Sequence, residues 1–311
     1  MIIPQRQNWW RIVLSYRGTE LPRTKWRILG VALVALVVTY FEENRGFHPN
    51  LTPLPYTLIS VALGIFLGFR NNASYDRWWE GRKLWGALVN TSRTIARQFT
   101  TLVGPRGAAA DPEVVALRKA LVYRAIAFVH ALRLSLRNAT DYSELAAFLP
   151  KDEVDQLARE TNKPAAITHR GAIILREAWE RGWIETMHLP VLESSLTGLT
   201  DIQGGCERIK STPIPFLSTT LMHRIVAVYC YSLPFGVVDA VKIYTPFVVI
   251  LVAYAFFGLD VVGDELEEPF GTDPNDLSLS AISRMIEVNL RQRLGETELP
   301  PLLQPVNEVL S

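Results

Sequence analysis

Four apolar segments restrict the fold of this chain more than any other feature of its sequence. They are residues 28–41, residues 56–69, a stretch from the motif "TPIPFL" to residue 238, and residues 243–262. The fourth has the roughly 20 apolar residues that a helix needs to cross the hydrocarbon core of a bilayer. The first has only about fourteen, but basic residues precede it and Glu42 and Glu43 follow it. This asymmetry is typical of a membrane helix that starts in the cytoplasm.

The remaining sequence is more polar and reads as soluble helix. Apolar residues recur three and four positions apart in "EVVALRKALVYRAIAFVHALRLSLR", which indicates an amphipathic helix, and we find no alternation typical of strands. We therefore predict an all-α protein, divided into a cytoplasmic N-terminal segment (1–27), transmembrane helices 1 and 2 (28–70), a large cytoplasmic helical region (71–212), transmembrane helices 3 and 4 (213–262) and a cytoplasmic C-terminal segment (263–311).

Composition and motifs exclude several classes of function. The 311 residues carry a net charge of only +1 and no basic stripe, so nucleic acid is not expected as a partner. The common catalytic and phosphate-binding motifs are absent, so we expect neither an enzyme nor a resident cofactor. The two cysteines, Cys206 and Cys230, lie in different kinds of segment, which argues against a disulfide or a zinc site.

The stretch "FLGFRNNASYDRWWEGR" runs from an apolar into a polar sequence with no turn residue between them. On a continuous helix at about 100° per residue, one sector of roughly 80° would contain an apolar row followed by polar positions: Val61, Ile65, Phe69, Asn72 and Asp76. Arg70 and Arg77 would point to the opposite side. Around a symmetry axis, several such helices would form a dry constriction that opens into a wet vestibule.

Other interpretations of these residues remain open. An aliphatic row at a spacing of four is also typical of an ordinary helical core, and Asn72 with Asp76 also fits a solvated helix face. Arg77 is expected to bind a carboxylate or a carbonyl group in the helix bundle. Asp260 and Arg224 are the charges within the last two apolar segments. Because an isolated charge in a membrane is costly, we predict that they pair.

Three longer motifs carry a family resemblance. "FLGFRNNASYDRWWEGRKLWG", "GCERIKSTPIPF" and "DELEEPFGTDPND", in this order, resemble the bestrophin family of ion channels, particularly its short bacterial members. The resemblance extends from the N-terminal basic segment to about Gly295. It implies a homopentamer with four transmembrane helices per subunit and one central pore on the fivefold axis.

The resemblance also implies roles for particular residues. The hydrophobic neck of the pore falls on Val61, Ile65 and Phe69, which is the row identified above, with Asn72 and Asp76 in the vestibule beyond it. The second constriction, the cytosolic aperture, falls in "RGWIETMHLP", where the best match is Met187 and the alternative is Ile184. The acidic stretch after the last apolar segment resembles the calcium clasp of animal members, with Asp273 and Asp276 at two matching carboxylate positions and Glu268 where those members usually carry Asn. The alternative there is an acidic loop that caps a helix, without calcium.

We therefore expect a passive channel for small monovalent ions in the bacterial inner membrane, with both termini in the cytoplasm. Its partners would be further copies of itself, membrane lipids and the permeant ions. The family label is chloride or anion channel. Asp76 would instead favour cations, so a monovalent cation channel of the sodium type is the close alternative. A membrane-anchored helical scaffold or sensor is the alternative from another class of protein.

Overall fold

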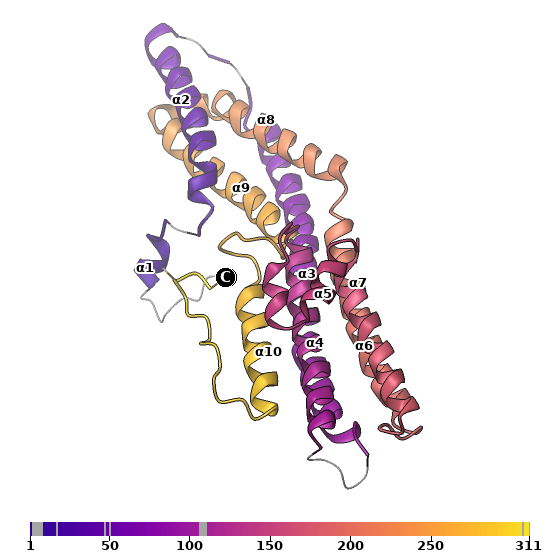
Figure 1. The fold of residues 1–311 in the computed structure, drawn as a ribbon. Coiled ribbons are helices and arrows are strands. Elements are labelled where there is room, and N and C mark those ends of the chain that lie inside the picture. The colour runs from indigo at the N-terminus through magenta and orange to yellow at the C-terminus, as the bar shows by residue number, and fades with distance from the viewer. Residues whose placement is uncertain are drawn as a thin grey trace. The chain divides into compact units, whose positions relative to one another are not determined.

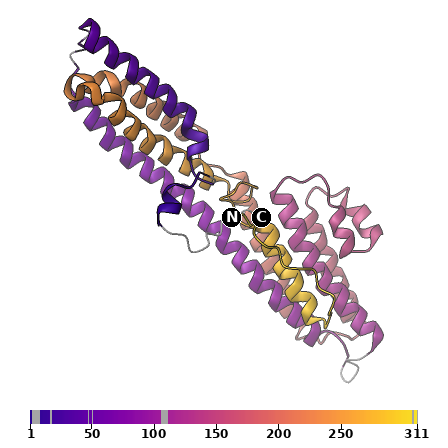
Figure 2. The same cartoon turned by 90° about the vertical axis from the view of Figure 1, so that its left-hand side faces the viewer.

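The fold was analysed in a computed structural model, which describes residues 1, 9–16, 18–46, 48–49, 51–105, 111–306 and 308–310. This part of the chain is all-α, as predicted (Figures 1 and 2). Its one departure from helices and loops is an isolated antiparallel bridge between Val306 and Val309.

Ten α-helices and two short 3₁₀ helices make up the described chain. The α-helices are α1 (Trp9–Val13), α2 (Leu21–Arg45), α3 (Leu54–Leu102), α4 (Pro112–Leu136), α5 (Lys151–Leu157), α6 (Lys163–Glu180), α7 (Leu189–Ser211), α8 (Phe216–Val241), α9 (Thr245–Glu267) and α10 (Leu279–Arg293). The 3₁₀ helices are η1 (Ser143–Ala147) and η2 (Lys242–Tyr244).

These helices form two compact units. The apolar unit comprises the described residues of Pro4–Trp79 and Pro213–Pro269, and the polar unit comprises those of Met1–Ile3, Glu80–Thr212 and Phe270–Ser311. The long helix α3 contributes residues to both units. One boundary, after Thr212, is the position at which the sequence predicts the return to apolar helices.

Three helical stretches of the described residues are long and apolar enough to cross a membrane: Leu21–Arg45, Leu54–Leu102 and Phe216–Glu267. The last contains both α8 and α9, so four helices carry the four predicted apolar segments. Each helix extends beyond the C-terminal end of its apolar segment, because the charged residues that follow remain helical. In α2, for example, Arg23 near the start forms an ion pair with Glu265 at 3.3 Å, and Gly46 ends the helix in the left-handed conformation.

The core of the apolar unit lies among α2, α3, α8 and α9. Small residues on α2 and α9, Ala35 and Ala253, are fully buried and let these helices approach closely. Larger side chains fill the space around them: Val31, Leu63, Leu67, Val226, Leu233, Val249 and Phe257. Cys230 belongs to the same core and is a free thiol. The consequence is that α3 has one packed face in this unit, which fixes the direction of its other faces.

The polar unit is built around α4, which packs against α6, α7 and α10. Ile126, Phe128 and Leu132 of α4 are fully or almost fully buried. Its start is set by Asp111, whose carboxylate accepts a hydrogen bond from the backbone N–H of Glu113 at 2.9 Å. Cys206 of α7 is buried in this unit, also as a free thiol.

Candidate functional site

The polar and apolar residues of interest on α3 form one exposed row in the apolar unit. Val61, Ile65 and Phe69 are 59%, 53% and 67% exposed. Asn72 and Asp76 are exposed as well. We call these five residues the exposed row. The alternative that they belong to the core of the subunit is therefore wrong.

The exposed row lies directly opposite the packed face of α3. The buried positions of this segment are Leu63, Leu67, Arg70 and Ser74. At 100° per residue their mean direction is about 170° from the mean direction of the row. The row therefore points away from the subunit's own core, and its polar end is poorly suited to contact with lipid.

Arg70 fixes this orientation through a buried ion pair. Its side chain is 3% exposed, and its Nη1 lies 2.8 Å from Oδ1 of Asp260, whose side chain is 1% exposed. The other nitrogen, Nη2, binds Asp264. The remaining oxygen of Asp260 lies 2.7 Å from Nδ1 of His223 and 3.5 Å from Nη1 of Arg27. One carboxylate of α9 thus joins side chains of α2, α3 and α8.

Two further hydrogen bonds hold α3 against α9. The Asn71 amide donates to the backbone oxygen of Leu259 at 3.0 Å, and Arg77 Nε donates to that of Glu267 at 3.1 Å. The prediction that Arg77 binds a carbonyl or carboxylate is confirmed. Gly263 allows this close approach, since a Cβ at that position would lie 2.6 Å from Oδ1 of Asn71. These contacts set both the rotation and the register of α3.

The predicted pairing of Asp260 with Arg224 is wrong. Arg224 is exposed on α8, and the carboxylate of Asp260 is bound to Arg70, His223 and Arg27. Arg70 is the better partner because it lies on the packed face of α3. The sequence indicates the direction of Arg70, since the helical projection places it on the side of α3 opposite to the exposed row.

Among the described residues of the apolar unit, two groups of side chains have the spacing of metal ligands: Glu42, His48 and Asp239, and His223, Asp260 and Asp264. Both already have cationic partners. Lys242 Nζ lies 2.8 Å from Glu42, and Arg70 binds Asp260 and Asp264. A metal ion would have to displace these cations, so neither group is a strong candidate for a metal site.

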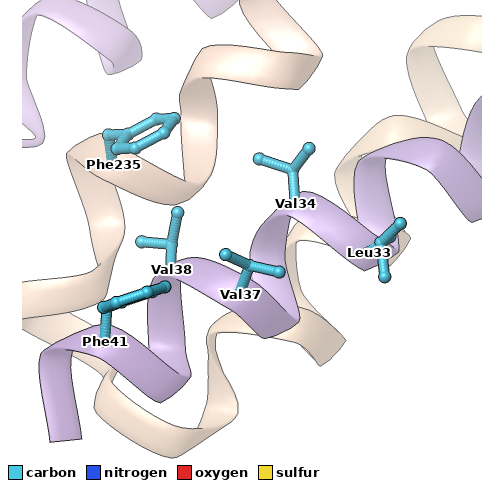
Figure 3. Close-up of a pocket in the computed structure, with 6 residues that line it drawn as sticks. All are labelled: Leu33, Val34, Val37, Val38, Phe41 and Phe235. Carbon is cyan, nitrogen blue, oxygen red and sulfur yellow. The ribbon is translucent and has the colours of Figure 1, made fainter. Parts of the chain in front are cut away.

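The apolar unit also has a hollow of about 510 Å³ between α2 and α8 (Figure 3). It is lined by Leu33, Val34, Val37, Val38, Phe41 and Phe235. None of these side chains can form a hydrogen bond. The hollow is therefore no candidate for a polar or ionic ligand.

The remaining predicted residues lie outside the exposed row. Met187 is 80% exposed, whereas Ile184 is 3% exposed, so exposure favours Met187 as the residue that faces an aperture. Glu268 is exposed just after α9. Asp276 is buried, and its Oδ2 accepts a hydrogen bond from the backbone N–H of Asp273 at 2.7 Å. Burial raises the pKa of Asp276 to about 6. Calcium binding by these carboxylates stays a prediction.

The sequence of the chain matches a family model described as "Bacterial/Fungal Bestrophin protein" over residues 1–292. A protein of Ralstonia nicotianae, named a voltage-dependent anion channel-forming protein, is 38% identical over 301 residues, which are 96% of each chain. The protein YneE of Escherichia coli K12, with the same description, is 35% identical over an alignment of 315 positions that covers 98% of each chain.

The fold also matches solved structures. The crystal structure of a bacterial bestrophin homolog from Klebsiella pneumoniae superimposes with a TM-score of 0.80 at 32% sequence identity. The match covers 88% of this chain and 99% of the other. The sequence and the fold therefore agree on the same relatives.

Proposed function

Because the chain belongs to the bacterial and fungal bestrophin family, we propose that it is a membrane channel through which anions pass down their gradient. Relatives of almost equal length are named anion channel-forming proteins. Three helical stretches of the described residues, which contain α2, α3, α8 and α9, are long and apolar enough to cross a membrane. The names of these relatives describe channels and not enzymes.

The exposed row on α3 is the observation that carries this proposal. A single subunit leaves the row uncovered, although its apolar part is followed by Asn72 and Asp76 on the same face. Lipid would cover the first part well and the second part poorly. An arrangement of five α3 helices around a central axis suits both parts of the row, because the apolar part forms a narrow neck and the polar part faces water.

In this arrangement ions pass through a sequence of different surroundings. Rings of Val61, Ile65 and Phe69 form a hydrophobic neck that can exclude water and thereby gate the pore. Asn72 and Asp76 line the vestibule next to the neck. Met187 forms a second constriction at the cytosolic side. The buried ion pair of Arg70 with Asp260 supports this arrangement, because it holds α3 with the neck residues pointing away from the subunit's own core.

Orientation in the membrane follows from the charges that flank α2. Arg23, Lys25 and Arg27 lie in its first two turns, whereas Glu42 and Glu43 lie near its end. Basic residues are enriched on the cytoplasmic side of membrane helices. We therefore place both termini of the chain in the cytoplasm and the protein in the bacterial inner membrane.

Conduction of monovalent cations is a second candidate function, and Asp76 is the observation that favours it. Its carboxylate is exposed on the same face as the neck residues. Five copies around an axis would concentrate cations and repel chloride. The sign of the permeant ion therefore depends on whether this ring or positive groups elsewhere along the pore dominate.

Ion flux into vesicles that contain the purified protein tests the proposal. Replacing Val61, Ile65 and Phe69 together by Ala widens the neck. Because these side chains are exposed in the subunit, their loss removes little buried surface, so we expect higher flux with assembly preserved. A stopped-flow chloride or sodium flux assay gives the rate.

Phe66→Ala is the matched control. Phe66 is 55% exposed, close to the neck residues, but projects about 100° away from the mean direction of the row. It should leave the flux at the wild-type value. Unchanged flux in the triple variant would contradict the channel proposal and favour a membrane-anchored scaffold.

A further inference from the structure

The polar unit has a basic hollow of about 340 Å³ between the C-terminal half of α3 and the end of α10. Six residues line it, each helix contributing positions i, i+1 and i+4: Arg93, Thr94, Arg97, Asn289, Leu290 and Arg293. Figure 2 shows α10, in yellow, alongside this half of α3. Three guanidinium groups therefore lie around one hollow.

The three arginines have no counter-charge in the described chain. Arg93, Arg97 and Arg293 are exposed, and none of them forms an ion pair with a described carboxylate. Other arginines of the same unit differ. Arg124 binds Glu153, and Arg291 binds Glu287 and Glu296. The three cationic groups around this hollow therefore lack a carboxylate partner among the described residues.

The other residues of the hollow suit a polar ligand that enters from one side. Leu290 is 1% exposed and forms an apolar floor. Thr94 supplies a hydroxyl group. Asn289 donates one N–H to the backbone oxygen of Met285 at 2.8 Å, which leaves its second N–H available. The hollow therefore combines three guanidinium groups with two neutral hydrogen-bonding groups.

We propose that this hollow binds a small soluble anion that carries two or more phosphate groups. Arginine is suited to phosphate because its planar guanidinium group donates two parallel hydrogen bonds. The volume of about 340 Å³ lies near the lower end of the about 300–1,000 Å³ of ligand sites, and exceeds what one phosphate group needs. The site adds ligand binding to the proposed ion conduction and does not depend on it.

Stabilisation of helix ends is the competing explanation for these residues. Arg97 lies in the last two turns of α3, and Arg293 is the last residue of α10. Cations near helix C-termini interact favourably with the helix dipole. This explanation requires no ligand and does not explain why the arginines surround a hollow. A binding measurement distinguishes the two explanations, because only the proposed site predicts saturable binding of a phosphate compound.

Titration of the purified full-length protein with pyrophosphate, at constant ionic strength in detergent without phospholipid, tests the proposal. We expect saturable binding, with inorganic phosphate binding more weakly. Arg97→Gln and Arg293→Gln should each lower the affinity at least about tenfold, because each removes a charge-assisted pair of hydrogen bonds. Arg97→Lys keeps the positive charge but loses the planar guanidinium group. Its affinity for pyrophosphate should therefore lie between those of the wild type and Arg97→Gln.

Arg170→Gln is the matched control, since Arg170 is an exposed helical arginine of the same unit outside the hollow. It should bind pyrophosphate as the wild type does. Absence of saturable binding to the wild type, or an equal loss in Arg170→Gln, would overturn the proposal. Disassembly of Arg97→Gln without any wild-type binding would assign the arginines to contacts between subunits. Displacement of pyrophosphate by phosphatidylglycerol, added as mixed micelles with the same detergent, would assign them to a lipid headgroup.

Discussion

Six positions separate Arg70 from Asp76 on α3, yet the two charges lie in opposite surroundings. Arg70 is buried against Asp260, whereas Asp76 is exposed on the far side of the helix. The helical period alone separates them, and for this reason both directions could be predicted from the sequence. Burial makes Arg70 important for the stability of the subunit, and exposure makes Asp76 available to permeant ions.

Replacing Asp76 by Asn tests its role in selectivity. If five carboxylates line the vestibule, their removal should shift the relative permeability toward anions. The shift should shrink in concentrated salt, because the Debye length falls from about 10 Å at 0.1 M to about 3 Å at 1 M. Reversal potentials of purified protein in bilayers under a salt gradient measure it.

Arg77→Gln serves as the control for that experiment. Arg77 lies toward the packed side of α3 and donates to the carbonyl group of Glu267. Its replacement should reduce stability without changing the sign of the permeant ion. A reversal potential unaffected by Asp76→Asn would place Asp76 outside the pore and leave anion conduction as the better description.

His130, in the polar unit, lies between two carboxylates. Its Nδ1 is 3.2 Å from Glu144 and its Nε2 is 3.4 Å from Glu287. Burial disfavours the charged imidazole, but the hydrogen bond to Glu144 and the nearby carboxylate of Glu287 outweigh it and raise the pKa of His130 above 6.5. Burial likewise opposes ionisation of Glu144, but hydrogen bonds to His130 and Arg133 lower its pKa to about 2. A protonated His130 therefore connects α4, η1 and α10.

The stability of the polar unit should depend on pH through this cluster. The contribution of His130 is complete below pH 6.5 and is lost as the pH rises through its raised pKa. That of Glu144 is complete above pH 4.5 and is lost as the pH falls through about 2. Thermal unfolding midpoints above pH 6.5 should therefore fall less steeply with pH in His130→Gln than in the wild type.

His169→Gln is the matched control, because His169 is exposed on α6. The unfolding midpoint of this variant should fall with pH as steeply as that of the wild type. Equal slopes in all three proteins would mean that His130 is neutral in the folded protein.

At the scale of elements, α3 combines contacts that sequence patterns reveal with contacts that they do not. Its apolar and polar periodicity predicts the exposed row. The partners of its polar residues lie on α9, about 190 positions away in the chain, as for Arg70 and Asp260. No local pattern identifies a partner at that distance, which is why Arg224 was the wrong expectation. The ends of α2 also differ from the predicted apolar segment, since hydropathy detects only the apolar centre of this helix.

Breaking the ion pair on α3 should destabilise the protein strongly. Arg70→Met leaves Asp260 buried without its arginine partner on α3, and loss of one member of a buried pair costs about 3–5 kcal/mol. Arg77→Met removes the hydrogen bond of its Nε to the carbonyl group of Glu267, and a lost hydrogen bond of this kind costs about 0.5–3 kcal/mol. Thermal unfolding in detergent should therefore show a larger decrease for Arg70→Met. An equal decrease in both variants would show that the pair does not hold α3 in place.

At the scale of the whole molecule, the sequence predicts the all-α architecture and the four apolar helices that the structure contains. Length and hydropathy suffice for this, because a helix must satisfy its own backbone hydrogen bonds in lipid. The calcium clasp and the cytosolic aperture are different. They depend on residues brought together by folding or by assembly, so that sequence patterns leave them as predictions.

Assembly is the remaining expectation at this scale. A pore with a polar vestibule needs several subunits around it, and the family resemblance implies five. Mass measurement of the purified protein in detergent should give about five times the chain mass of 35.0 kDa, after correction for bound detergent. A stable monomer would contradict the channel proposal, whatever the flux variants show.

The burial of both cysteines has a practical consequence. Cys206 and Cys230 are fully buried, and burial raises the pKa of the Cys206 thiol to about 12. Thiolates are the reactive form of cysteine, so the folded wild-type protein should react very slowly with maleimides and methanethiosulfonates. Single cysteines can then be introduced along α3 without first removing the native ones. Labelling rates at successive positions would map which face of the helix water reaches in the assembled protein.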